Sequence, residues 1–155
     1  MIRPRPILAV GSAAPPLSWE HGDARRDLAT ACRARGALVL FLPLAGAPVC
    51  RDDVRAIAAA ALELCAPARP LILVSVDRPA HLRRFLDEVG AQSLIACGDP
   101  DLSAARDFGV EHVGGFALRA SFLIDREARV AAAAHHPIGF VRPIALLREW
   151  CAMLR

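Results

Sequence analysis

The sequence lacks any apolar run that approaches the roughly 18–20 residues of a membrane-spanning helix. The apolar stretch at residues 6–10 ends at Gly11 and is too short for the core of a secretory signal. There is no basic stripe either, because the arginines are scattered and the net charge is only +3. We therefore expect a cytoplasmic protein that binds neither membranes nor nucleic acid.

The sequence also lacks a CxxC pair and any spacing typical of a zinc site. His135 and His136 are adjacent, and adjacent residues of a strand point to opposite faces, so they do not favour a shared metal ion. We expect no metal and no cofactor. In a reducing compartment the five cysteines are expected to be free thiols: Cys32, Cys50, Cys65, Cys97 and Cys151.

What the sequence does contain is an alternation of buried strands and helices along 155 residues, which fits one domain spanning 1–155. Continuous apolar runs predict buried strands, and helical spacing of apolar residues predicts helices. A polar turn near the C-terminus predicts a hairpin. We expect an α/β fold with a mixed central sheet and helices on both faces. The predicted strands are 7–10, 37–42, 71–76, 93–96, 120–124 and 130–134, and the predicted helices are 23–35, 51–64, 79–89, 102–108 and 140–154.

One segment stands out chemically. The apolar run 37–42 ends at Pro43, and a short loop then delivers Cys50 to the start of the helix predicted after it. Unpaired backbone N–H groups and the positive end of the helix dipole favour an anion there. A cysteine at such a position is a candidate for a reactive thiolate.

Five short motifs, in order, make nearly the whole chain resemble the peroxiredoxins, the alkyl hydroperoxide reductase and thiol-specific antioxidant family. The one-cysteine and bacterioferritin-comigratory-like bacterial members look closest. The motifs are Gly11-Ser12-Ala13-Ala14-Pro15, the run from Leu40 to Cys50, Val74-Ser75-Val76-Asp77, Gly98-Asp99-Pro100-Asp101 with Phe108-Gly109-Val110, and Arg119-Ala120-Ser121-Phe122-Leu123-Ile124-Asp125. The resemblance implies a thioredoxin-like fold and a thiol-dependent peroxidase that reduces hydrogen peroxide or organic hydroperoxides.

The resemblance also implies roles for particular residues. Cys50 would attack the peroxide and become a sulfenic acid, and Arg119 would be the fixed cation that lowers the thiol pKa and stabilises the leaving oxygen. Pro43 would shape the pocket wall. Val49 and Ala47 would contact the substrate, with backbone N–H groups of Val49 and Cys50 as further donors.

The chain departs from the family pattern at Ala47, where relatives carry a Thr or Ser hydroxyl that orients sulfur and peroxide. The loss of one positioned donor costs on the order of 2.7–4 kcal/mol of transition-state stabilisation. An alternative function therefore stays open: a weakened peroxiredoxin-fold protein that acts as a redox sensor or interaction module. A thioredoxin-type disulfide oxidoreductase is disfavoured, because Asp53 stands where the second cysteine of a CxxC pair would be.

The cysteine that would resolve the sulfenic acid is not evident. Cys65 is expected at the far end of the helix that begins near Cys50, about 22 Å away at about 1.5 Å per residue. Cys97, at a strand end, is the best intramolecular candidate. The simplest expectation is one-cysteine chemistry, with an external thiol of the thioredoxin, glutaredoxin or low-molecular-weight type as reductant. The resemblance is compatible with a homodimer, but nothing in the sequence indicates an interface.

Overall fold

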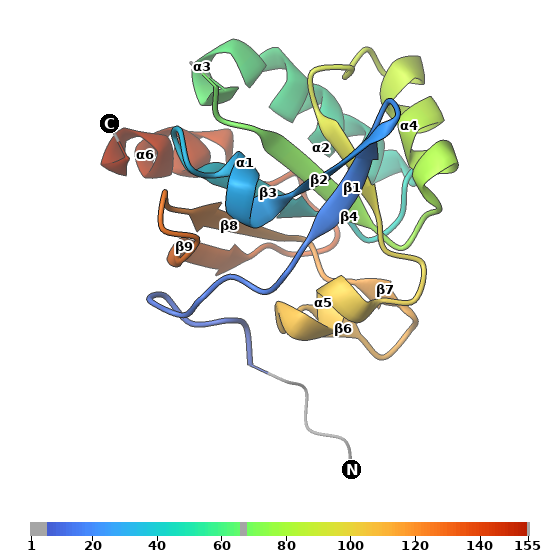
Figure 1. Ribbon diagram of the computed structural model, residues 1–155. Helices are drawn as coiled ribbons and strands as arrows, with labels where there is room; N and C mark the ends of the chain where they lie inside the picture. The colour runs from blue at the N-terminus through green and yellow to red at the C-terminus, as the bar shows by residue number, and fades with distance from the viewer. Residues whose placement is uncertain (1–5, 66–67, 155) are drawn as a thin grey trace.

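A five-stranded mixed sheet forms the centre of the computed structural model, which describes residues 6–65 and 68–154 and leaves the side chain of Cys65 undescribed (Figure 1). Its strand order is β5-β4-β3-β8-β9. Three neighbouring strands are parallel, and β8 and β9 add to them in antiparallel fashion. The strands are β3 (Ala37–Phe41), β4 (Leu71–Ser75), β5 (Ile95–Gly98), β8 (Ala120–Ile124) and β9 (Val130–His135). The predicted mixed α/β sheet is confirmed.

Both faces of the sheet are covered, as the continuous apolar strands require. Every residue of β3, β4 and β8 is buried. Alternate residues of β3 enter two separate cores, with Leu38 and Leu40 in one and Val39 and Phe41 in the other. This division is why the strands lack the hydrophobic–polar alternation of a half-exposed sheet.

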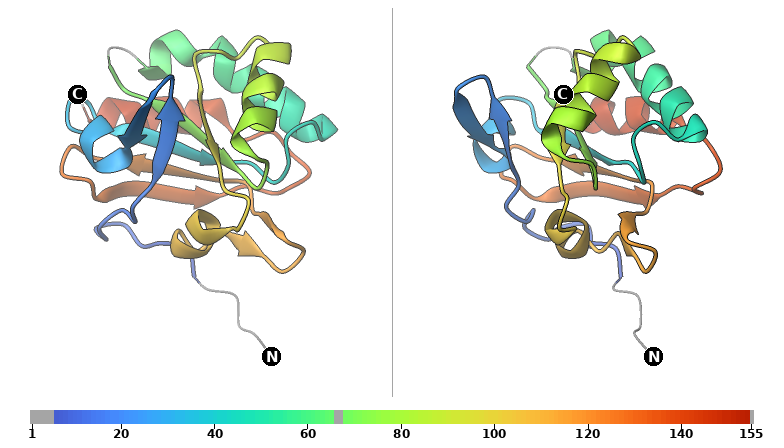
Figure 2. Two further views of the ribbon diagram at one scale, coloured as in Figure 1. Left: turned by 45° about the vertical axis from the view of Figure 1, so that its right-hand side comes forward. Right: turned by 90° about the vertical axis from the view of Figure 1, so that its right-hand side faces the viewer.

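Different elements cover the two faces (Figure 2). One face carries α2 (Pro48–Ala59), α3 (Ala61–Cys65), α4 (Pro79–Glu88) and α6 (Ile144–Met153). The other carries α1 (Leu28–Ala31), α5 (Ser103–Asp107) and the hairpin of β1 (Ser18–His21) with β2 (Ala24–Asp27). Helices therefore lie on both faces, as predicted. Within the part of the chain that the structure describes, no helix is long and apolar enough to cross a membrane.

The strand predicted at residues 7–10 is wrong. The Leu8 N–H donates to the carbonyl of Phe108 at 3.1 Å, but no strand forms before Ser18 within the described residues. Gly11 turns the chain with a φ of +91°, and Pro15 and Pro16 follow. A glycine turn and two residues without a backbone N–H prevent a continuous ladder of hydrogen bonds.

The helix predicted over 23–35 is also wrong, because most of its first half forms strand β2. Gly22, with a φ of +61°, makes the tight turn that brings β2 back along β1. The helix starts only at Leu28, where the carboxylate of Asp27 accepts a hydrogen bond from the Thr30 N–H at 2.8 Å. All four residues of β2 are exposed, so no apolar pattern marked it as a strand.

The single helix predicted over 51–64 is two helices. The first begins three residues earlier, at Pro48, and ends at Ala59. Ala60 then leaves the helical conformation, and its N–H is shared between the carbonyls of Ala56 and Ile57. Cys65 therefore ends a separate helix, α3, and not the helix that carries Cys50.

The other predicted elements are confirmed, with shifted ends. The third strand runs two residues later than predicted, as Ile95–Gly98. The last helix begins at Ile144 rather than at residue 140, because Pro143 occupies its N-cap position. A small hairpin that the sequence analysis missed, β6 (Glu111–His112) with β7 (Phe116–Ala117), leads into β8. Each of its strands has two residues, too short for a period to be read.

Candidate active site

Cys50 lies at the carboxyl end of the parallel strands, in the first turn of α2. The chain leaves β3 after Phe41, passes through the loop 42–47 and enters the helix at Pro48. Proline suits the first helical position because its missing N–H would have no helical partner there. Cys50 is then the third helical residue, and its side chain is only 2% exposed. The thiol therefore lies beside backbone N–H groups that have no hydrogen-bond acceptor within the helix.

The loop before Cys50 is anchored to the neighbouring strand. A carboxylate oxygen of Asp77, two residues after β4, accepts hydrogen bonds from the Ala45 N–H and the Ser75 hydroxyl, each at 2.8 Å. His81 lies 3.0 Å from the other oxygen of Asp77. Asp77 thus acts as a strand-end residue that fixes the active-site loop.

Arg119 reaches the thiol from the opposite part of the chain. It immediately precedes β8 and is fully buried. Its Nη2 and Nη1 atoms lie 3.4 and 3.7 Å from the Sγ of Cys50. Its Nε and Nη2 donate to the carbonyls of Phe140 and Ile138 at 3.0 and 3.1 Å. The loop before α6 therefore holds the guanidinium in a fixed position beside the sulfur.

Two further charged residues complete this cluster, and the sequence analysis missed both of them as site residues. Asp53, one helical turn after Cys50, and Arg142 are both fully buried. The Nη2 of Arg142 lies 2.9 Å from the Oδ2 of Asp53, and the Nη1 of Arg119 lies 3.6 Å from the same oxygen. The i, i+3 spacing from Cys50 could have indicated Asp53. No comparable signal marked Arg142, which lies far away in the sequence.

Arg142 also joins the cluster to the sheet. It donates to the carbonyl of Phe41 at 2.8 Å and to that of Ala120 at 3.1 Å. Its Nη1 also donates to the hydroxyl of Ser121 at 3.0 Å, and that hydroxyl lies 2.9 Å from the Nε2 of His136. Burial is the main cause that lowers the pKa of His136 to about 4, and the nearby guanidinium of Arg142 acts in the same direction. A neutral His136 can accept the proton of Ser121.

Burial raises the pKa of the Cys50 thiol above its ordinary value. A backbone hydrogen bond from Leu44 and the guanidiniums of Arg119 and Arg142 lower it, whereas the Asp53 carboxylate raises it. Arg119 thus acts in the predicted direction, but the pKa is raised overall. Burial outweighs the effect of Arg119, and the sequence did not reveal how completely the site is buried.

The charges of the cluster nevertheless suit a thiolate once it forms. Two guanidiniums and one carboxylate leave one excess positive charge beside the sulfur. A Cys50 thiolate compensates that charge, and buried charges are tolerated when they are paired and hydrogen-bonded. The fixed guanidinium of Arg119 can also donate to an oxygen bound at the sulfur.

The remaining predicted site residues surround this centre. Pro43 is buried in the loop after β3, and Val49 is half-buried in the first turn of α2. Ala47 is the N-cap residue of α2 and forms no side-chain cap with the first turn. Pro43, Ala47 and Val49 thus belong to the same segment as Cys50, and Arg119 lies against the thiol from another part of the chain.

The structure does not bring Cys97 to the site. Cys97 belongs to the core on the opposite face of the sheet from Cys50. Its thiol donates to the carbonyl of Ser18 at 3.5 Å, and burial raises its pKa to about 12. Of the other cysteines, Cys32 shares that far core, and Cys151 lies in α6. The cysteines whose side chains the structure describes are free thiols.

Exposed apolar side chains gather on the two loops that flank the thiol. They belong to Leu44, Ile138, Phe140 and Val141, which are 48%, 41%, 69% and 41% exposed. The backbone of Leu44 forms a hydrogen bond with the Cys50 thiol, and the carbonyls of Ile138 and Phe140 accept hydrogen bonds from Arg119. We call these four side chains the apolar rim.

A cysteine at a helix N-terminus, paired with a fixed arginine on a thioredoxin-like sheet, defines the class of thiol-based peroxidases. A family model described as "AhpC/TSA family" matches residues 10–133, so the chain belongs to this family. It is a peroxiredoxin-type thiol peroxidase, a class of enzymes that act on peroxides and are reduced by thiols.

Solved structures agree with this fold. A peroxiredoxin-like protein from Aquifex aeolicus is 22% identical, with a TM-score of 0.83 over 97% of this chain and 90% of the other. The reduced 2-Cys peroxiredoxin from Plasmodium vivax is 24% identical, with a TM-score of 0.77 over 93% and 81%. Reduced Prx3 from Vibrio vulnificus, in complex with hydrogen peroxide, is 18% identical, with a TM-score of 0.78 over 93% and 99%. No curated protein matches the sequence.

Proposed function

We propose that Cys50 is the nucleophile that reduces hydrogen peroxide or an organic hydroperoxide in this protein. The observation that carries the proposal is the fully buried guanidinium of Arg119, which lies 3.4 Å from the Sγ of Cys50. The carbonyls of Ile138 and Phe140 hold this guanidinium in place, so it needs no rearrangement when charge develops on the reacting oxygens.

In the proposed reaction, the Cys50 thiolate attacks one oxygen of the peroxide as the O–O bond breaks. Sulfur gains that oxygen and is oxidised to sulfenic acid, while the other oxygen leaves as alkoxide or hydroxide and takes up a proton. Arg119 stabilises the leaving oxygen, and the N–H groups of Val49 and Cys50 supply further donors at the helix end. Pro43 forms part of the wall beside them.

We propose that an external thiol reduces the sulfenic acid, because the structure does not place Cys97 beside Cys50. One thiol condenses with the sulfenic acid to a mixed disulfide and releases water, and a second thiol restores Cys50 and leaves as a disulfide. The reductant would be of the thioredoxin, glutaredoxin or low-molecular-weight type. Cytoplasmic location, homodimer formation and a single domain over 1–155 stay predictions.

The test is the second-order rate of Cys50 oxidation by hydrogen peroxide and by cumene hydroperoxide, with the product read by intact mass. We expect one added oxygen per chain in the wild type and in Cys32→Ser, and none in Cys50→Ser. Arg119→Gln is expected to slow oxidation by about 10²–10³-fold, the usual effect of losing a positioned charge-stabilising donor. Oxidation no faster than that of a free small-molecule thiol would refute peroxidase activity at Cys50.

A second candidate function is that of a slow redox sensor or interaction module on the same fold. Two observations favour it: Ala47 supplies no hydroxyl, and burial raises the pKa of the Cys50 thiol. Both slow the reaction at neutral pH without removing the nucleophile. A sensor would form sulfenic acid that persists in the presence of thiols, whereas an efficient peroxidase would turn over repeatedly.

A further inference from the structure

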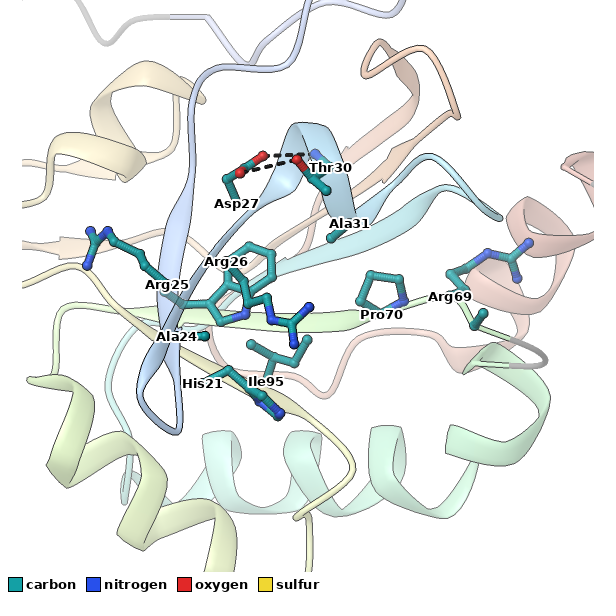
Figure 3. Close-up of a pocket in the computed structure, with 12 residues that line it drawn as sticks. His21, Ala24, Arg25, Arg26, Asp27, Thr30, Ala31, Arg69, Pro70 and Ile95 are labelled. Atoms are coloured by element: carbon teal, nitrogen blue, oxygen red, sulfur yellow. Dashed lines mark hydrogen bonds between the residues drawn. The ribbon is translucent and has the colours of Figure 1, made fainter.

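A cavity of about 740 Å³ lies beside the β1–β2 hairpin (Figure 3). Pro70 and Ile95, at the amino ends of β4 and β5, form part of its wall. Cys50 instead follows the carboxyl end of β3, which runs parallel to β4. The cavity and the thiol therefore lie at opposite ends of the parallel strands, and the peroxidase chemistry leaves the cavity without a role.

One arginine in this cavity is free to bind a ligand. Arg25 donates to the hydroxyl of Ser18 at 2.8 Å, and Arg69 donates to three backbone carbonyls, those of Arg35, Leu64 and Cys151. Arg26 is exposed and has no hydrogen bond or ion pair with any described residue. In the view of Figure 3 its guanidinium points towards the side of the lining that holds Ile95, while Arg25 points away. The lining thus presents one unused guanidinium.

The acidic side chain in the lining does not offset this charge. Asp27 is engaged as the N-cap of α1, where it accepts hydrogen bonds from the N–H and the hydroxyl of Thr30. Its carboxylate and the guanidinium of Arg26 are not paired in the structure. An anion that enters the cavity can therefore pair with Arg26 without displacing an existing ion pair.

The rest of the lining favours an apolar body on the ligand. Trp19, which is 5% exposed, lines the cavity together with Ala31, Pro70 and Ile95. Half of the lining residues are polar or charged, but most of the surface that they expose to the cavity is apolar, as is typical of a site for a small organic molecule. The planar oxygens of a carboxylate match the fork of N–H donors on Arg26. Arg25 and Arg69 bond only to neutral groups, so their charges add to the positive potential that attracts an anion to this cavity.

We propose that this cavity binds a small alkyl or aryl carboxylate, with its carboxylate on Arg26 and its apolar body against Trp19 and Ile95. This site is separate from the peroxidase site and does not depend on Cys50. The carboxylate forms a charge-assisted pair with the guanidinium. The apolar body of the ligand is removed from water when it packs against the apolar side chains of the cavity.

The test is calorimetric titration of the intact protein with decanoate. We expect saturable binding at one site, weakened at least about tenfold in Arg26→Gln because a charge-assisted hydrogen bond is lost. Arg33→Gln, which removes the same charge from an exposed residue outside the lining, is the matched control and should bind as wild type does. Decanol and decyltrimethylammonium carry the same chain without the negative charge and should bind much more weakly.

Fluorescence locates the ligand. The chain has two tryptophans, so Trp150→Phe leaves Trp19 as the only reporter, and decanoate should change its emission at the concentrations found by calorimetry. No binding, equal loss in Arg26→Gln and Arg33→Gln, or equal affinity for decanol would overturn the proposal. Cys50→Ser should bind decanoate as wild type does, and Arg26→Gln should react with peroxide at the wild-type rate. A failure at one site is therefore distinguishable from a failure at the other.

Discussion

Replacing Ala47 with threonine should repair the start of α2 and quicken the oxidation of Cys50. Ala47 is the N-cap of the helix that carries the thiol, and its methyl group can accept no hydrogen bond from the first turn. An N-cap hydroxyl accepts from the N–H of either the second or the third helical residue, here Val49 or Cys50, so the other N–H stays available to a bound peroxide. The same hydroxyl can direct its proton to the sulfur or to a bound peroxide oxygen.

Two effects are expected, each with a typical size. A threonine cap in place of alanine stabilises a helix by about 1 kcal/mol, so the free energy of unfolding should rise by roughly that amount. One added donor at the developing charge is worth on the order of 2.7–4 kcal/mol, so the oxidation rate should rise by about 10²–10³-fold. The hydroxyl should also lower the pKa of the Cys50 thiol, because it donates to the thiolate form.

Urea unfolding measures the first effect, and competition kinetics with hydrogen peroxide measure the second. Ala47→Val is the matched control, since valine has nearly the shape of threonine without its hydroxyl. We expect Ala47→Val to show neither gain. If the threonine and valine variants oxidise at the same rate, the missing hydroxyl is not what limits Cys50. If Ala47→Thr also fails to gain stability, the N-cap reasoning is refuted as well.

Three further predictions follow from the charges and surfaces of the site. Lowering the pH from about 7.5 to about 4.5 should cost roughly 2–3 kcal/mol of unfolding free energy through His136. Burial lowers its pKa from 6.5 to about 4 in the folded protein, so the unfolded chain alone takes up the proton in this range. This contribution is fully present above pH 6.5 and is lost as the pH falls towards 4. Urea unfolding at the two pH values should show a smaller loss in His136→Asn. The oxidation rate of Cys50 should keep rising with pH through and beyond the pH range in which an ordinary thiol ionises, because burial raises the pKa of this thiol. A rate that stays constant between about pH 7 and 9 would contradict this prediction. Phe140→Ser should slow the reaction with cumene hydroperoxide more than that with hydrogen peroxide, because Phe140 supplies much of the apolar rim. If the two measured rates fall equally, the rim is not a surface that binds the substrate.

Much of the central sheet could be predicted from the sequence because its signal is local. Strands β3 and β4 are continuous apolar runs, and burial on both faces leaves nothing to interrupt them. The N-terminal hairpin could not be predicted in the same way. Its second strand is entirely exposed, and its residues suit a helix as well as a strand, so the turn at Gly22 and the cap at Asp27 decided the outcome.

The residues of the active site likewise differ in whether the sequence indicated them. The position of Cys50 after a strand and at a helix start is visible in the sequence, and the motif around Arg119 indicated its partner. Asp53 was visible only as a residue of the first helical turns, and Arg142 gave no signal. The way the two arginines share one carboxylate depends on three segments that meet only in the folded chain.

The sequence by itself determined the strands of the central sheet, the candidate nucleophile and the missing hydroxyl at Ala47, because each depends on residues close together in the chain. Tertiary structure alone decided how deeply the thiol is buried, and therefore that its pKa is raised despite two nearby guanidiniums. It alone placed Cys97 on the far face of the sheet and left Arg26 without a hydrogen-bond or ion-pair partner among the described residues, in a cavity at the opposite end of the strands. Burial and pairing are properties of residues distant in sequence, so no local pattern encodes them.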